Sequence, residues 1–107
     1  MTNLRVRVLT RLTAHPEREQ ELKNTLVQFM QERCQQVGCH NCELLHHLTN
    51  AAEFILVEEW DAEARIKSEL DSQLFARLGE AAAELFIEPL QIHWYEVIPP
   101  QSCTETQ

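Results

Sequence analysis

The side chains best suited to chemistry come at the end of the most apolar stretch of the chain, where Glu58 and Trp60 follow the run at residues 54–57. Branched and aromatic side chains fill that run, which favours a strand over a short buried helix. Because successive strand side chains alternate between faces, Phe54, Glu58 and Trp60 are expected on the same face. An indole and a carboxylate on one buried face can hold a flat aromatic substrate. The alternative is that Trp60 fills the core between the sheet and a helix.

His46 is the candidate general base. It neighbours His47 in a predicted strand, so the two imidazoles point to opposite faces. Alternation places His46 with Cys42 and Leu44, which would make Cys42 part of the same substrate site. An imidazole titrates near neutral pH, so in an apolar pocket it could take a proton from a phenol or hydroquinone. The alternative is a partly exposed histidine at the edge of the sheet.

Cys39 and Cys42 form a Cys-x-x-Cys pair, with Cys34 before it and His46 after it, and such spacing also occurs in zinc and redox sites. In an extended strand, residues three apart are about 10 Å apart and residues four apart about 13 Å. Those distances are too long for one metal ion or one disulfide. No metal site is therefore predicted, and only a turn at Cys39 would change that conclusion.

Periodicity predicts a strand and a helix at the start of the chain. Apolar side chains alternate over residues 4–13, which indicates a strand with one apolar face. Pro16 suits the first turn of a helix, which should run to about Gln36 and be ended by Gly38. Its core stripe has residues three and four apart, namely Leu22, Leu26, Phe29, Met30, Arg33 or Cys34, and Val37.

The rest of the chain predicts a hairpin, a second helix and a last strand. Residues 39–48 and 52–61 are strands that flank a polar turn. Asp61 is a candidate N-cap for a helix that continues towards Pro89, with a second cap near Asp71. Residues 91–98 form the fourth strand. A single domain is predicted for residues 1–98, followed by a polar tail at 99–107.

This order of elements predicts a ferredoxin-like α+β fold, βαββαβ, with a four-stranded antiparallel sheet and both helices on one face. The apolar run in the third strand indicates that the other sheet face is not polar, so it must be buried. A homodimer with two sheets packed face to face is expected, with Ile55 and Val57 in its interface. Arg5, Arg7 and Arg11 lie on that outer face and could pair with acidic residues of the partner or with an anionic group of a substrate.

Composition excludes several classes of partner. The 107 residues include 17 acidic and 9 basic side chains, for a formal net charge of −8, without the basic stripe that nucleic-acid-binding proteins need. Charges interrupt every short apolar run near the N-terminus, so neither a signal peptide nor a membrane-spanning helix is predicted. We expect a cytoplasmic protein whose four cysteines are reduced.

Several short motifs, in their order and spacing over roughly residues 4–97, resemble the antibiotic biosynthesis monooxygenase (ABM) family. They are residues 9–14, the helix start at 17–22, Gly38-Cys39, the strand start at 42–44, Glu58-Glu59-Trp60 and Glu88-Pro89. The resemblance implies a dimeric α+β barrel. That family includes cofactor-independent quinol and polyketide oxygenases, heme-degrading oxygenases and signal-processing enzymes, so membership alone does not assign a reaction.

The chain departs from the family pattern at several functional positions. Many quinol-oxygenase-like members carry two histidines where this chain has Glu69 and Leu74. Heme-degrading members use an asparagine at the position of Thr10 and a histidine at the position of Gly79, which leaves no iron ligand here. Trp60 matches the tryptophan that shapes the pocket of those enzymes.

We therefore expect a cofactor-independent monooxygenase that oxidises a small aromatic substrate, such as a quinol or a polyketide-like phenol, with O₂. His46 would be the base, Trp60 and Thr10 would orient the ring, and Glu58 would orient the imidazole or bond a substrate hydroxyl. One alternative is a non-catalytic dimeric module that binds a small hydrophobic ligand or a partner. Another is a non-oxidative isomerase or signal-processing enzyme of the same fold.

Overall fold

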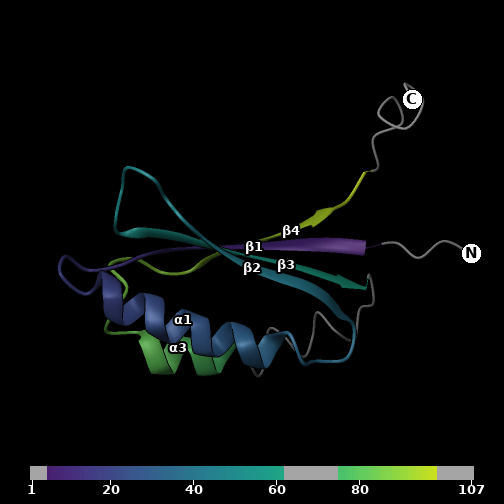
Figure 1. Cartoon of the computed structure of the whole chain (residues 1–107), viewed down its shortest axis with the longest axis horizontal. Coiled ribbons are helices and arrows are strands. Elements are labelled where there is room, and N and C mark those ends of the chain that lie inside the picture. Colours follow the sequence, from purple (N-terminus) through teal and green to yellow (C-terminus); the bar gives the residue numbers. More distant parts are fainter. Residues whose placement is uncertain (1–4, 62–74, 99–107) are drawn as a thin grey trace, which may run out of the picture.

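The computed structural model describes residues 5–61 and 75–98. Its elements in chain order are β1 (Arg5–Thr13), α1 (Glu19–Arg33), β2 (Cys39–His46), β3 (Glu53–Asp61), α3 (Phe75–Ala82) and β4 (Gln91–Glu96). The strands form one antiparallel sheet in the order β2-β3-β1-β4. Both helices cover the same face (Figure 1). The predicted ferredoxin-like α+β fold is confirmed.

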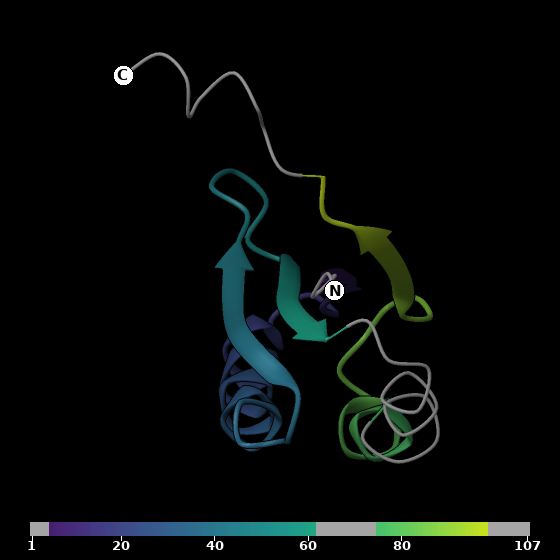
Figure 2. The same cartoon turned by 90° about the vertical axis from the view of Figure 1, so that its right-hand side faces the viewer.

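The two helices lie side by side under different parts of the sheet. Figure 2, an end-on view, shows α1 beneath the β2 side and α3 beneath the β4 side. The buried core lies between this helical layer and the sheet, and the central strands β1 and β3 supply five of its eleven described buried apolar residues. Its buried apolar residues are Val8, Leu12, Ala14, Leu22, Leu26, Phe29, Phe54, Leu56, Trp60, Leu78 and Leu85.

The first helix is shorter than the sequence predicts. It begins at Glu19 because Glu17 has φ 71°, in the left-handed region, where a helix cannot start directly after Pro16. It ends at Arg33, and the chain then turns through Gly38, whose φ of 96° favours glycine. The predicted end at Gln36 is wrong by one turn, although the breaking role of Gly38 is consistent with this conformation.

The β2–β3 hairpin is confirmed, with β2 two residues shorter than predicted. The backbone N–H groups of Thr49 and Asn50 donate to Nδ1 of His47, at 3.1 and 2.9 Å, so this histidine closes the turn. At the other end of β2 a bulge between Cys39 and Asn41 shifts the register.

The second helix differs from its prediction at its end. Residues 62–74 lie outside the described part, and so do the predicted cap at Asp71, Glu69, Leu74 and the tail at 99–107. Within the described part, α3 ends at Ala82 rather than continuing to Pro89. Residues 85–87 pair instead with the end of β1, where Ala14 bridges to Phe86 and the His15 N–H donates to the Leu85 carbonyl at 2.8 Å.

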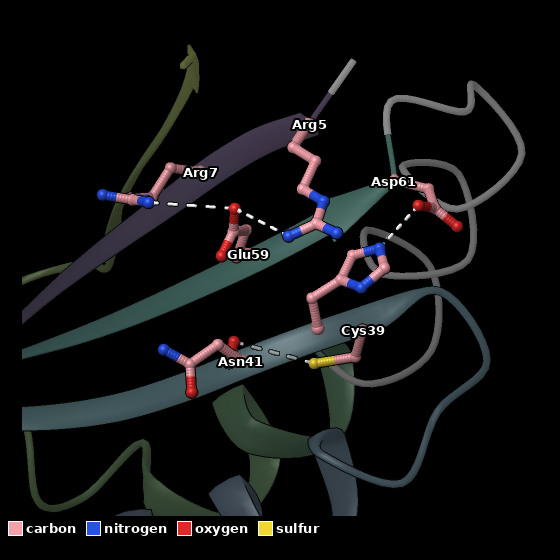
Figure 3. Close-up of polar contacts among 7 residues, drawn as sticks. Arg5, Arg7, Cys39, Asn41, Glu59 and Asp61 are labelled. Atoms are coloured by element: carbon pink, nitrogen blue, oxygen red, sulfur yellow. Dashed lines mark hydrogen bonds and ion pairs between the residues drawn. The ribbon is translucent and has the colours of Figure 1, made fainter. Parts of the chain in front are cut away.

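The sheet face away from the helices combines apolar side chains with ion pairs. Arg5 and Arg7 both approach Glu59, at 3.4 and 3.8 Å, and Figure 3 shows the two guanidinium groups on either side of that carboxylate. Arg11 pairs with Glu53 at 3.3 Å. The arginine row therefore finds acidic partners within its own chain. Between these pairs lie Leu9, Leu45, Ile55, Val57 and Tyr95, which we call the outer apolar strip.

No helix in the described residues, 5–61 and 75–98, is long and apolar enough to cross a membrane.

Candidate functional site

A buried ion pair joins the end of α1 to β3. The Arg33 guanidinium donates two hydrogen bonds to Glu58, from Nε to Oε2 at 2.7 Å and from Nη2 to Oε1 at 2.5 Å. Both side chains are fully buried. The indole N–H of Trp60 donates to Glu58 Oε1 at 3.1 Å. Both carboxylate oxygens of Glu58 are therefore engaged by protein donors, which offsets the cost of burying its charge.

Arg33 reaches this position because it continues the core stripe of α1. It lies four residues after Phe29, and its guanidinium carbon is 5.2 Å from the centre of the Phe29 ring and 5.3 Å from that of Trp60. A cation over aromatic faces is attracted by their negative ring surfaces, more so when water is excluded. The sequence left Arg33 and Cys34 as alternatives for this stripe, and the structure selects Arg33.

These contacts correct the predicted role of Glu58. As predicted, Phe54, Glu58 and Trp60 share the face that looks towards the helices. Glu58, however, binds Arg33 and Trp60 and no imidazole. The Trp60 N–H is also engaged with Glu58 and is not free to bond a substrate oxygen. Two features of the sequence could have indicated the pair. Glu58 shares the alternation of the buried residues of its strand, and Arg33 lies on the apolar face of the helix that packs against that strand.

His46 lies at the opposite end of the sheet from Trp60. It is the Cα partner of Phe54, which is six residues from Trp60 along β3, a distance of about 20 Å in an extended strand. Its ring stacks on Phe54 with centroids 4.3 Å apart, and Nε2 donates to the Ala51 carbonyl at 2.8 Å. The imidazole is exposed at the edge strand. One small substrate cannot contact both His46 and Trp60, so the structure does not bring the two predicted catalytic residues together.

An open cleft lies beside α3, at the same end of β1 as Ala14. Its volume is about 430 Å³, and its lining residues are Gly79, Ala83, Phe86, Ile87, Glu88, Pro89 and Leu90. A β-carbon at Gly79 would meet no atom within 4 Å, so the absence of a side chain there leaves open space. Among these described lining residues Glu88 alone is ionisable. The cleft is thus a mostly apolar surface with one carboxylate.

Thr10 lies farther into the core than this cleft. Its Cα partner on β4 is Ile92, two residues along the chain from Leu90 of the cleft lining. The Thr10 side chain is fully buried, and its hydroxyl has no hydrogen-bond partner among the described residues. An unpaired buried hydroxyl carries a desolvation cost that a polar ligand atom can remove.

The bulge in β2 overturns the distance argument made for the cysteines. Cys39 pairs with Trp60 and Cys42 with Glu58, so three steps on β2 oppose two on β3. The two sulfurs are 3.6 Å apart. A hydrogen bond with Cys42 lowers the pKa of Cys39, whereas hydrogen bonding with Cys39, burial and the neighbouring Cys34 raise the pKa of Cys42. In the described residues no group of three or more His, Cys, Asp or Glu side chains is arranged to hold a metal ion.

Comparisons with known proteins agree on the family and the fold. The model of the antibiotic biosynthesis monooxygenase family matches residues 5–81. A search of curated proteins found no match to the sequence. Among solved structures, a Nitrosomonas europaea protein named as a candidate antibiotic biosynthesis monooxygenase superposes with a TM-score of 0.79 at 11% identity, over 94% of this chain and 96% of that one.

Two further solved structures superpose on this chain over most of its length. A conserved Methanosarcina mazei Go1 protein has a TM-score of 0.74 at 24% identity, covering 86% of this chain and 91% of its own. The Pseudomonas aeruginosa protein PA3566 has a TM-score of 0.77 at 17% identity, covering 92% and 98%. At these identities the likeness concerns the fold.

The buried ion pair generates a prediction about stability. Arg33→Met leaves the Glu58 charge buried without its counter-charge, and we expect the free energy of unfolding to fall by about 3–5 kcal/mol. The double variant Arg33→Met/Glu58→Leu should lose less than Arg33→Met alone, because no buried charge remains. Urea unfolding followed by circular dichroism measures both.

A matched control breaks an exposed ion pair instead. Arg18 pairs with Glu21 on the surface of α1, so Arg18→Met should leave the unfolding midpoint nearly unchanged. Equal losses for Arg33→Met and Arg18→Met would show that the buried pair does not hold α1 to the sheet.

Proposed function

Since this chain belongs to the antibiotic biosynthesis monooxygenase family, we propose that it is a cofactor-independent monooxygenase that oxidises a small aromatic substrate with O₂. The substrate class is a quinol or a polyketide-like phenol. The observation that carries the proposal is the apolar cleft beside α3. A volume of about 430 Å³ lies within the range of pockets that bind small ligands.

The lining of the cleft suits a flat, largely apolar molecule. Phe86 offers an aromatic surface, and Pro89 and Leu90 add aliphatic contacts. Gly79 itself adds no side chain to the helix side of the cleft, and a β-carbon there would meet open space. The resemblance places an iron-binding histidine at this position in heme-degrading members, so glycine here fits a substrate that needs no iron ligand.

The reaction needs little from the protein beyond proton transfer and positioning. In the keto tautomer of the phenol or quinol the reacting ring carbon is a CH₂, and overall it becomes a carbonyl: one oxygen atom of O₂ enters the substrate, and the other leaves as water with the two hydrogens. The electrons come from the substrate anion itself. The protein would take the proton that forms this anion, stabilise the oxyanion and exclude water.

Glu88 is the proton acceptor nearest to the cleft among the described residues. His46 lies on β2, three strand spacings from β4, or about 14 Å away across the sheet. Its predicted role as the base would require the substrate to bind at the other sheet edge. The Thr10 hydroxyl would donate to a substrate oxygen that reaches inward past Leu90, in keeping with its predicted role in orienting the ring.

The roles predicted for Trp60, Phe54 and Cys42 in contacting the substrate stay predictions. Trp60 and Phe54 are 1% exposed, so a substrate would reach them only if the core opened. This observation favours a second candidate function, a non-catalytic module that binds a small hydrophobic ligand in the cleft. A ligand that binds but consumes no oxygen would support that candidate, and anaerobic turnover would support an isomerase.

We also propose that the chain forms a homodimer through the outer apolar strip. Leu45 and Tyr95 are 47% and 50% exposed on that face, and a groove of about 410 Å³ runs beside Tyr95 and Ile98. Two such faces would cover one another, with Ile55 and Val57 in the interface as predicted. Apolar surface of this kind is costly to leave in water.

Filling the cleft should abolish oxidation. Gly79→Leu places an aliphatic side chain in open space, so we expect the fold to remain and oxygen uptake with hydroquinones or polycyclic phenols to fall roughly 100-fold. Gly79→Ala is the matched control: it should keep most of the activity and raise the free energy of unfolding by up to about 1 kcal/mol through better helix propensity. Full activity of Gly79→Leu would place the substrate elsewhere.

Removing the cleft carboxylate should slow the proton transfer. We expect Glu88→Gln to lower kcat roughly 100-fold with little change in KM, because the amide keeps the shape but cannot take the proton. His46→Ala should stay within about threefold of the parent, since one small substrate cannot reach both sites. The opposite ranking of the two variants would restore His46 as the base. Oxygen-electrode kinetics distinguish the outcomes.

A charge in the outer apolar strip should dissociate the dimer. Leu9→Lys would bring two lysines towards each other across the interface, and we expect monomers by light scattering at micromolar concentration. Gln28→Lys, on the exposed side of α1, adds the same charge and should remain dimeric. A Leu9→Lys variant that stays dimeric would show that another surface is used.

A further inference from the structure

We propose that Cys39 and Cys42 form a redox-active dithiol, which small hydroperoxides oxidise to an intramolecular disulfide. This site lies at the opposite end of the sheet from the cleft and does not rest on the proposed monooxygenase function. The chemistry is that of the thiols and needs no substrate in the cleft.

The geometry needed for a disulfide is nearly present. The two sulfurs are 3.6 Å apart, and a disulfide bond is about 2.0 Å long, so they must approach by about 1.6 Å. Cys39 lies at the β2 bulge, where the ladder to β3 is already interrupted, so it can move towards Cys42, which stays paired with Glu58. β2 is an edge strand and pairs with a neighbouring strand on one side only, so its backbone can shift more easily than that of a central strand. Closure can therefore occur without breaking the sheet.

The two thiols are chemically unequal. The two sulfurs share a hydrogen bond in which either can donate, and this bond with Cys42 lowers the pKa of Cys39. The positive charge of Arg33 acts in the same direction, whereas burial and the Glu58 carboxylate oppose it. Hydrogen bonding and burial raise the pKa of Cys42. Cys39 is thus the thiol that ionises first and attacks, and Cys42 is the thiol that resolves.

The reaction balances with one hydroperoxide per pair. The Cys39 thiolate attacks the terminal oxygen, the O–O bond breaks, and Cys39 becomes a sulfenic acid while the alkoxide or hydroxide takes up a proton. The Cys42 sulfur then attacks the Cys39 sulfur, the S–O bond breaks, and water leaves. The two sulfurs lose two electrons in total, and the peroxide is reduced to water and an alcohol, or to two waters.

The surroundings give small reagents access to the pair. Cys39 and Cys42 are only partly buried, and Figure 3 shows the Cys39 thiol at the edge strand, directed towards the Asn41 carbonyl at 3.8 Å. Cys34 is exposed at the end of α1 and close enough to raise the pKa of Cys42. An external thiol or Cys34 can therefore attack the disulfide and return the pair to the reduced state.

A two-cysteine variant tests the proposal directly. In Cys34→Ser/Cys103→Ser, Cys39 and Cys42 are the remaining thiols, so any intramolecular disulfide joins them. We expect one equivalent of hydrogen peroxide to remove both free thiols, lower the intact mass by two hydrogens and leave the chain uncrosslinked to others. Dithiothreitol should restore both thiols. Two thiols that stay free, or that form only disulfides between chains, would overturn the proposal.

Single variants in the same background test which thiol attacks. With Cys42→Ser the serine keeps a hydrogen-bond donor beside Cys39, and we expect dimedone to trap a sulfenic acid there. With Cys39→Ser the remaining Cys42 should react roughly tenfold more slowly. Circular dichroism of the reduced variants verifies their fold. Equal rates for the two would contradict the assignment of Cys39, and loss of the disulfide with intact oxygen uptake would leave the proposed function standing alone.

Discussion

The arrangement of this chain depends on the buried ion pair between Arg33 and Glu58. It joins the last turn of α1 to the central strand β3 by two hydrogen bonds. The two N–H groups of a planar guanidinium match the two oxygens of a carboxylate in spacing. The pair lies between Phe29 and Trp60, so the same cation also fixes two aromatic rings. Its burial is tolerable because every oxygen of Glu58 has a donor. The same 15-residue helix also buries Leu22, Leu26 and Phe29 against the sheet.

Periodicity was sufficient to predict the four strands, the order of helices and strands along the chain, and which side chains of each strand face the helices. Burial in β1 and β3 alternates, and the run at residues 54–57 lies in the middle of the sheet. What failed were features that interrupt periodicity. The positive φ of Glu17 shortened α1, the pairing of residues 85–87 with β1 ended the second helical region early, and the β2 bulge moved Cys39. Each is a local deviation of the backbone, and the periodicities of two residues for a strand and 3.6 for a helix do not predict such deviations.

Site prediction was limited for a different reason. Alternation assigns a residue to a face but says nothing of its position along the strand relative to another site residue. His46 and Trp60 share a face and are nonetheless at opposite ends of it. Alternation also does not identify the partner of a side chain. Glu58 was expected to face a substrate, but its carboxylate binds Arg33. The cleft depends on Gly79 and on a segment, residues 86–90, whose course the sequence did not suggest.

The ion pairs on the outer sheet face compensate much of its charge within the chain itself. Arg5 and Arg7 share Glu59, and Arg11 pairs with Glu53 of the same chain, so the face carries most of its own counter-ions. A surface of this kind attracts no partner over a distance by its field, and added salt has few uncompensated charges to screen. Whatever covers it must recognise the contour of the apolar strip. The arginine–glutamate pairs would then add little to the attraction, and recognition of this face would be selective through shape.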